Sequence, residues 1–167
     1  NKSDLISFSK FIGNNLDLTQ GAGGNTSVKD GQIMWVKASG FCLCDADIKN
    51  IFVPVNYFEI LKRLENGDDD PVGPEVINTH QADELLRPSI ETTLHALMPH
   101  RYVTHIHSVN VLANAVSQEG KEVFCKLLAG VKWSWVPYVR PGVPLTKAVQ
   151  NATHSDPDVL ILANHGV

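Results

Sequence analysis

The feature that most constrains the fold is an alternation of helical and strand-like segments over residues 89–167. Helical patterns separate short runs rich in β-branched, aromatic and aliphatic residues: the helices are expected at 89–99, 109–117, 121–129 and 144–153, and the strands at 102–109, 133–139 and 158–167. This alternation is typical of α/β domains, in which helices cover the faces of a sheet. The sequence therefore predicts an α/β fold.

The first half of the chain adds an antiparallel element to this picture. Residues 4–16 place apolar side chains at helical spacing, with Asp4 as the expected cap. An Asp30-Gly31 turn joins two strand-like runs, the second from Ile33 to Ala38. A further helix is expected at 56–66, followed by an acidic surface loop. The hairpin favours a single domain with a mixed β-sheet flanked by helices.

Composition excludes several classes of protein. The chain has 167 residues, of which 43% are hydrophobic, which is enough for one compact domain. No Lys/Arg-rich stripe indicates nucleic-acid binding, and no apolar run reaches the length of about 18 residues that a membrane span needs. The first residues lack a signal-peptide pattern, and the odd number of cysteines, three, favours reduced thiols. We expect a soluble, cytoplasmic protein without nucleic-acid or membrane partners.

The domain is expected to occupy residues 1–167 and to continue beyond them. An apolar strand such as 158–167 normally leads into a further element, so a C-terminal helix is expected after Val167.

Three histidines form the candidate metal site. Side chains alternate along a strand, so His105 and His107 should share one face at a spacing that one metal ion can bridge. His165 follows the apolar run at 159–163, at a strand end where ligand sites of α/β sheets gather. Three protein ligands with one open position are typical of catalytic zinc. The alternative for the His-x-His pair is an ordinary half-exposed strand.

Glu91 is the candidate acid/base beside these histidines. It lies near the start of the helix that precedes the His-x-His strand, where the helix dipole favours an anion, although a solvated first-turn glutamate has the same pattern. His95, four residues later, is either a second ligand or, more in keeping with its helix, a packing residue behind the site. His80, His100 and His154 are interpreted as surface residues. A metal site at Cys42 and Cys44 would lack the usual spacing and a second pair.

Three turns indicate an anion pocket. The run 21–27 (Gly-Ala-Gly-Gly-Asn-Thr-Ser) can present bare backbone N–H groups, Ser39-Gly40 ends the following strand, and Ser89 is the expected cap of the helix that carries Glu91. Each turn alone is ordinary. Together with a metal site, they favour a substrate with a phosphate or carboxylate end.

Five motifs occur in order along the chain: residues 24–27 (Gly-Asn-Thr-Ser), 37–40 (Lys-Ala-Ser-Gly), 88–95 (Pro-Ser-Ile-Glu-Thr-Thr-Leu-His), 105–107 (His-Ile-His) and 164–166 (Asn-His-Gly). In combination they resemble the class II aldolase/adducin family, which includes fuculose-phosphate and rhamnulose-phosphate aldolases. The resemblance spans about residues 5–167 and implies a three-layer α/β/α fold. It implies a Zn²⁺ ion, or another divalent metal, on His105, His107 and His165, with Glu91 as the acid/base. It also implies that the substrate phosphate binds to Gly24, Asn25, Ser39, Gly40 and Ser89.

The activity that the resemblance implies is that of a zinc-dependent lyase in carbohydrate metabolism. Such an enzyme cleaves a ketose phosphate by a retro-aldol reaction, through a metal-stabilised enediolate and without a lysine Schiff base. Members of the family are commonly homotetramers, with the site at a subunit boundary and an assisting tyrosine from a neighbour or from the C-terminal region. Two alternatives stay open: a related dehydratase, decarboxylase or epimerase, and a noncatalytic adducin-like module.

Two positions bear on these alternatives. Ile90 stands where phosphate-binding aldolases usually carry a second serine, which predicts a weaker phosphate grip or a different substrate. Epimerases usually carry Asp at the position of Glu91, and adducin-like proteins lose the histidines, so both branches fit the sequence less well than an aldolase does.

Overall fold

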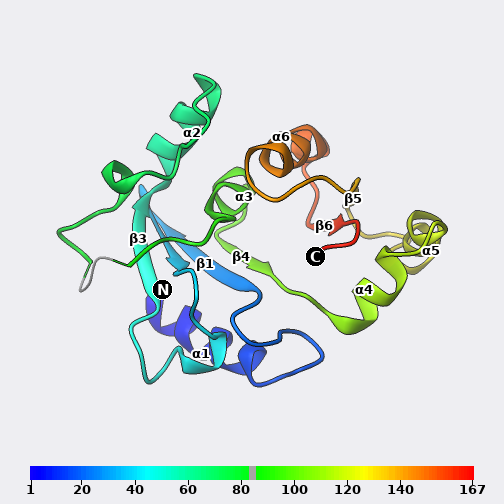
Figure 1. Cartoon of the computed structure of the whole chain (residues 1–167), viewed down its shortest axis with the longest axis horizontal. Helices are drawn as coiled ribbons and strands as arrows, with labels where there is room; N and C mark the ends of the chain where they lie inside the picture. Colours follow the sequence, from blue (N-terminus) through cyan, green and yellow to red (C-terminus); the bar gives the residue numbers. More distant parts are fainter. Residues whose placement is uncertain (83–85) are drawn as a thin grey trace.

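Four antiparallel strands form the larger sheet of the computed structural model, which describes residues 1–82 and 86–167 (Figure 1). The strand order is β3 (Phe52–Asn56), β2 (Ile33–Lys37), β1 (Asn25–Asp30) and β4 (Tyr102–His105). The expected hairpin is confirmed, because Asp30 pairs with Ile33 across a turn in which Gly31 has a φ of 62°. At the other end of β1, Asn25 pairs with His105. This register brings the Gly-rich turn beside the His-x-His motif.

A second sheet contains the parallel pair of strands β5 (Trp133–Val136) and β6 (Val159–Leu162). Helix α6 (Val143–Ala152) makes the crossover between them. The predicted α/β class, with parallel and antiparallel pairing in one chain, is confirmed, but the two kinds of pairing lie in separate sheets. Two backbone hydrogen bonds join the segments that follow β4 and β6: the Ile106 N–H donates to Val167 O at 2.9 Å, and the Val167 N–H donates to Ile106 O at 3.0 Å.

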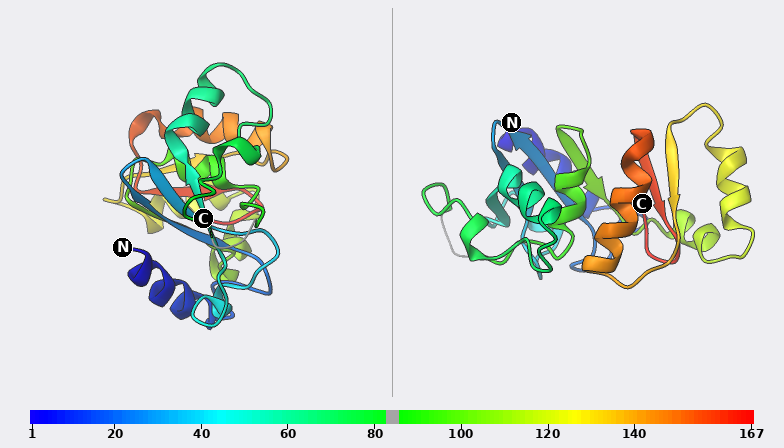
Figure 2. Two further views of the ribbon diagram at one scale, coloured as in Figure 1. Left: turned by 90° about the vertical axis from the view of Figure 1, so that its left-hand side faces the viewer. Right: turned by 90° about the horizontal axis from the view of Figure 1, so that it is seen from above.

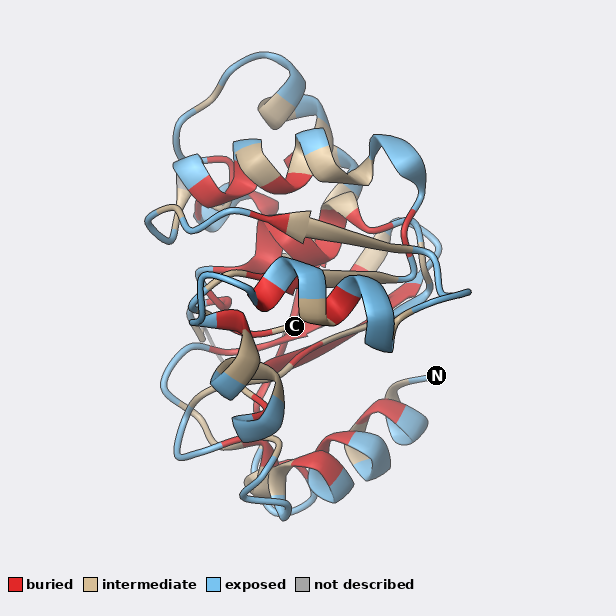
Figure 3. Cartoon of the chain, turned by 90° about the vertical axis from the view of Figure 1, so that its right-hand side faces the viewer, coloured by how far each residue is buried: buried red, intermediate tan, exposed pale blue. Residues whose placement is uncertain are grey.

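Helices cover both faces of the larger sheet, as Figure 2 shows. Period-two alternation sends Met34 and Val36 to one face and Trp35 to the other. Helix α1 (Lys2–Gly13) packs on the Trp35 face, and its buried and exposed sides are distinct in Figure 3. On the opposite face lies the larger core cluster, to which α2 (Tyr57–Glu65) and α3 (Thr92–Leu97) contribute.

The smaller sheet is covered in the same way. On one face α6 packs against the buried residues Val136 and Leu162, together with Leu94 from α3. On the other face α4 (Val109–Ala115) and α5 (Gly120–Leu127) pack around Ile161. The three-layer arrangement that the resemblance implied is therefore present. Three 3₁₀ turns complete the described elements, at Leu43–Asp45, Pro74–Val76 and Thr153–Ser155.

Several expected boundaries were wrong, for local reasons. Strand β3 was missed because Pro54 interrupts the apolar run; β3 is an edge strand, where a missing N–H is tolerated. The cap of α1 is Asn1, whose side chain accepts from the Asp4 N–H, and Asp4 completes a capping box. Within the described residues, no helix has the length and apolar character needed to cross a membrane.

Candidate metal centre and adjoining cleft

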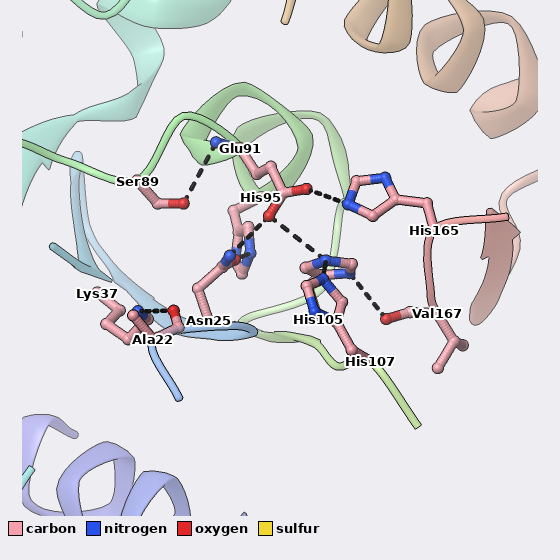
Figure 4. A network of polar contacts seen from close by, with 10 residues as sticks. All are labelled: Ala22, Asn25, Lys37, Ser89, Glu91, His95, His105, His107, His165 and Val167. Carbon is pink, nitrogen blue, oxygen red and sulfur yellow. Dashed lines mark hydrogen bonds and ion pairs between the residues drawn. The ribbon is translucent and has the colours of Figure 1, made fainter. Parts of the chain in front are cut away.

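The three predicted histidines lie together where the two sheets meet (Figure 4). His105 is the last residue of β4, His107 lies in the connection to α4, and His165 lies in the turn after β6. Their ligand nitrogens all lie within 4.8 Å of one another. The expected strand through residue 109 was too long, because Ser108 caps α4 and draws His107 out of the ladder. The cluster therefore depends on a strand end and two turns rather than on strand alternation alone.

The Asn-His-Gly turn holds His165 at the cluster. Asn164 has a φ of 55°, a conformation that asparagine tolerates better than most residues, and Gly166 donates its N–H to Leu162 O at 3.1 Å. A Cβ on Gly166 would lie 2.5 Å from Ile106 O and 3.0 Å from His105 Cε1. Glycine at 166 is thus required by close approach of the backbone to the histidine rings.

His105 is held in a form suited to bind a cation. Its Nδ1 lies 3.0 Å from the carbonyl oxygen of Val167, which can only accept, so Nδ1 carries the proton and Nε2 keeps its lone pair. Burial lowers the pKa of His105 to about 4, which leaves the ring neutral at neutral pH. Its Nε2 lies 3.0 Å from Nε2 of His107, whose pKa burial also lowers. Neutral, converging imidazole nitrogens are the donor set that zinc prefers.

Glu91 adjoins these histidines and is itself buried, with 7% of its surface exposed. Its Oε1 lies 2.9 Å from His165 Nε2, and its Oε2 lies 3.4 Å from His105 Nε2. The Asn25 side-chain amide donates to Oε2 at 2.7 Å. Burial raises the pKa of this carboxyl, but hydrogen bonds from His165 and Asn25 favour the ionised form, and the net effect lowers the pKa to about 2. Glu91 is therefore a carboxylate, and a solvated first-turn position is excluded.

The local structure around Glu91 differs from the expected capped helix. Helix α3 begins at Thr92, with Glu91 itself in the N-cap position and Ser89 outside the helix. The Ser89 hydroxyl instead accepts from the Glu91 N–H at 3.3 Å. The prediction of Ser89 as a helix cap was therefore wrong, because the chain turns tightly before α3 and directs Glu91 inward.

His95 stands behind the site and is not among the clustered ligands. It is 1% exposed, and its Nδ1 lies 2.7 Å from Ser27 Oγ. Its Nε2 contacts Asn25 Oδ1, while the amide nitrogen of Asn25 holds Glu91. The interpretation as a packing residue behind the site is confirmed. The sequence did not indicate this chain of contacts, because Asn25 lies 66 positions from Glu91 and 70 positions from His95.

A cleft of about 300 Å³ adjoins the cluster. It is lined by the histidines His107 and His165 and by the other predicted site residues, Gly24, Asn25, Ser39, Gly40, Ser89 and Glu91. Ile90 also lines it and is 56% exposed. The cleft is also lined by Lys37, at the end of β2, and by Pro141, neither of which the sequence indicated as a site residue. For Lys37, the available sequence signal was a charged residue at the end of an apolar strand.

The remaining histidines and the cysteines lie outside the cluster. His80 and His154 are exposed, as expected. His100 has a partner that the sequence did not indicate, Asp158 at 2.9 Å. All three cysteines are free.

Comparisons with known proteins give a consistent family assignment. The family model described as "Class II Aldolase and Adducin N-terminal domain" matches residues 3–167. A curated relative, the "Uncharacterized oxidoreductase YuxG" of Bacillus subtilis (strain 168), is 30% identical over 179 aligned residues. That alignment covers 98% of this chain but 25% of the relative, so the chain spans about a quarter of that protein.

Solved structures show the same fold. The N-terminal class II aldolase domain of a conserved protein from Thermoplasma acidophilum superposes with a TM-score of 0.79 at 27% identity, over 97% of this chain and 79% of that one. An L-fuculose 1-phosphate aldolase from Glaciozyma antarctica gives a TM-score of 0.61 at 14% identity, over 99% of this chain and 61% of that one. At that identity, the second comparison concerns the fold alone.

Proposed function

Because the chain belongs to the class II aldolase and adducin N-terminal domain family, we propose that it is a metal-dependent aldehyde-lyase that cleaves a ketose phosphate or a related ketose by a retro-aldol reaction. The observation that carries the proposal is the position of Glu91. A buried carboxylate lies 2.9 Å and 3.4 Å from two histidines of a three-histidine cluster, at the wall of a cleft. Buried ionisable groups with strongly shifted pKa values cluster at functional sites, which favours a catalytic site over a noncatalytic module.

The residues fit a divalent cation, with zinc as the first choice. His105, His107 and His165 would hold it, and the proton on His105 Nδ1 leaves the correct nitrogen free. When bound, the cation would act as a Lewis acid on the substrate carbonyl and stabilise negative charge that develops on its oxygen. The remaining cleft wall is left to bind and orient the substrate.

Glu91 is the proposed acid/base. In the cleavage direction, its carboxylate takes the proton from the hydroxyl on the carbon β to the carbonyl, and the bond between the α and β carbons breaks to release an aldehyde. The electron pair of the broken bond is shared by the α carbon and the carbonyl oxygen, and the α carbon then recovers the proton held by Glu91. Asn25 keeps the carboxylate aimed at this position through its 2.7 Å hydrogen bond, and burial limits competing solvent.

The same cleft would also bind the substrate phosphate. Gly24, Asn25, Ser39, Gly40 and Ser89 line the cleft, and the family resemblance implies that they bind the phosphate. Because the Asn25 side chain is already committed to Glu91 and His95 and its backbone pairs with His105 in the sheet, the phosphate contacts fall mainly to Gly24, Ser39, Gly40 and Ser89.

The proposal is tested with zinc-loaded protein and a panel of ketose 1-phosphates. We expect stoichiometric zinc by elemental analysis, release of dihydroxyacetone phosphate and an aldehyde from one of the sugars, and loss of both products after chelation. The matched control is Glu91→Gln, which should bind zinc but release both products at least about 100-fold more slowly. Protein that takes up no zinc, or that releases no product from any ketose phosphate while its cleft binds phosphate, would rule out this reaction.

A second candidate uses the same residues for dehydration, decarboxylation or epimerisation. The observation that favours it is Ile90, an exposed apolar side chain beside Ser89 at the wall of the cleft. Product analysis separates the two candidates, because only aldol cleavage divides the carbon chain into a ketone and an aldehyde.

A further inference from the structure

Two of the three cysteines, Cys42 and Cys44, lie in one turn beside the cleft, and the proposed reaction leaves them without a role. The turn follows Ser39 and Gly40, which line the cleft, and it continues into the 3₁₀ turn at Leu43–Asp45. Both thiols are free, and both residues are only partly buried, so a small oxidant can reach them.

The backbone holds the two cysteines at a separation that suits a disulfide. The distance between Cα atoms two positions apart depends on the conformation of the residue between them, here Leu43, the first residue of the 3₁₀ turn. A helical residue sets that distance to about 5.5 Å, within the range of about 4.4–6.8 Å found in disulfides. Helical residues two positions apart face away from each other, but Cys42 is extended, with a φ of −87° and a ψ of 140°. The two thiols accordingly interact with each other.

Neighbouring charges distinguish the two thiols. The ammonium groups of Lys37 and Lys49 both interact with Cys42, and a cation stabilises a nearby thiolate, the form of cysteine that attacks an oxidant. Lys49 also interacts with Cys44, but the Asp45 carboxylate lies beside that thiol, with its Oδ1 4.0 Å from Sγ. Burial raises the pKa of the Cys44 thiol, and Asp45 raises it further. Cys42 is therefore the thiol that reacts first, and Cys44 the one that completes the disulfide.

The two ends of the turn differ in their freedom to move. Leu43 is 1% exposed, and a Cβ on Gly13 of α1 would collide with the backbone of Leu43 and Cys44. Helix α1 thus packs directly against the Cys44 end and holds it in place. At the other end, Gly40 lines the cleft, and no atom of the described residues lies within 4 Å of a Cβ added there. A movement that joins the thiols therefore falls on the Cys42 end and reaches the wall of the cleft.

We propose that Cys42 and Cys44 form a redox modification site, which a hydroperoxide closes to a disulfide, and that this closure displaces the loop at 39–41. The Cys42 sulfur attacks one peroxide oxygen, the O–O bond breaks, and a sulfenic acid forms while the other oxygen leaves as water with the thiol proton. The Cys44 thiol then attacks that sulfur, and the S–O bond breaks to release a second water. Two electrons pass from the thiols to the peroxide, and a dithiol reductant reverses the change. The inference goes beyond the proposed reaction and does not depend on it.

The test oxidises the reduced protein with an equimolar amount of hydrogen peroxide, blocks the remaining thiols with iodoacetamide and maps tryptic peptides by mass spectrometry. Cleavage after Lys37 and Lys49 puts both cysteines on one peptide, 38–49, and Cys125 on another, 122–126. We expect peptide 38–49 to escape alkylation and to be two hydrogens lighter than its dithiol form, with Cys125 alkylated. Treatment with dithiothreitol before the block should restore alkylation of peptide 38–49.

Two variants separate the steps of the oxidation. Cys44→Ser removes the second thiol, so oxidation of Cys42 should stop at the sulfenic acid, which dimedone traps, without a disulfide. Cys125→Ser is the matched control, since Cys125 is exposed on α5, and it should oxidise like the unchanged protein. The urea midpoint shows that both variants fold. The proposal is refuted if Cys42 and Cys44 oxidise no faster than Cys125, or if the oxidised product is a disulfide-linked dimer.

Hydrogen exchange of the reduced and the oxidised protein measures the effect on the cleft. Ser39 donates its N–H to Arg87 O at 2.9 Å, so displacement of the loop should make exchange at 39–41 faster, while exchange in β1 stays unchanged. Unchanged exchange at 39–41 in fully oxidised protein would overturn the displacement of the loop. Zinc binding and sugar cleavage are measured on the reduced protein, so failure of the proposed function and failure of this inference are distinguishable.

Discussion

Gly166→Ala should weaken metal binding although residue 166 contributes no ligand. The added Cβ would lie 2.5 Å from Ile106 O and 3.0 Å from His105 Cε1, so the turn must move away from β4. That movement breaks the two hydrogen bonds between Ile106 and Val167 and the contact of His105 Nδ1 with Val167 O. At about 1 kcal/mol for each of these three hydrogen bonds, the loss destabilises the folded site by about 3 kcal/mol.

The consequence is measured as zinc affinity, by competition with a chromophoric chelator, and as the urea midpoint of the zinc-free protein. Loss of contacts that orient ligands typically weakens metal binding by about 10- to 100-fold. Gly31→Ala is the control: Gly31 has a φ of 62° and no atom within 4 Å of an added Cβ, so it reports backbone strain of about 1 kcal/mol alone. Equal zinc affinity in the two variants would refute the argument from close approach.

The remaining predictions concern ligands, orientation and buried charge. His107→Ala should abolish stoichiometric zinc binding, whereas Glu91→Gln should keep zinc and lower turnover by about 100-fold or more; equal loss of zinc in both would make Glu91 a ligand first. Asn25→Ala removes the 2.7 Å hydrogen bond to Glu91 and should lower kcat by about 10- to 100-fold with zinc retained, so an unchanged kcat would contradict the orienting role. Burial lowers the pKa of Lys29 to about 8, from 10.5 in the unfolded chain. Between these two pH values the unfolded chain binds more protons than the folded chain, so the free energy of unfolding should rise with pH. Urea titration at several pH values should show this rise, and Lys29→Met should lack it.

Sequence patterns were most informative where the evidence was local. The Asp30-Gly31 hairpin and the helical spacing of α2 depend on neighbours a few positions apart, and the structure has both. Boundaries were less accurate, because competing local signals decide them. Pro54 concealed an edge strand, and the Ser108 cap ended β4 two residues before His107.

The candidate site likewise has features that local sequence predicts and contacts between residues far apart in the chain. The spacing of His105 and His107, the glycine after His165 and the order of the motifs were enough to indicate a candidate metal site and the family. Motif order alone does not indicate that Asn25 would hold Glu91, that His95 would hold Asn25, or that Lys37 would be buried without a carboxylate.

The sequence by itself therefore determined the α/β class, the three candidate metal ligands and the candidate acid/base, since residue type and short spacing carry that information. Only the tertiary structure decided which groups meet. Asn25 and Glu91 are 66 positions apart, and His105 and Val167 are 62 apart. Such contacts are set by strand register and by the packing of helices on two sheets, where each position depends on the whole core.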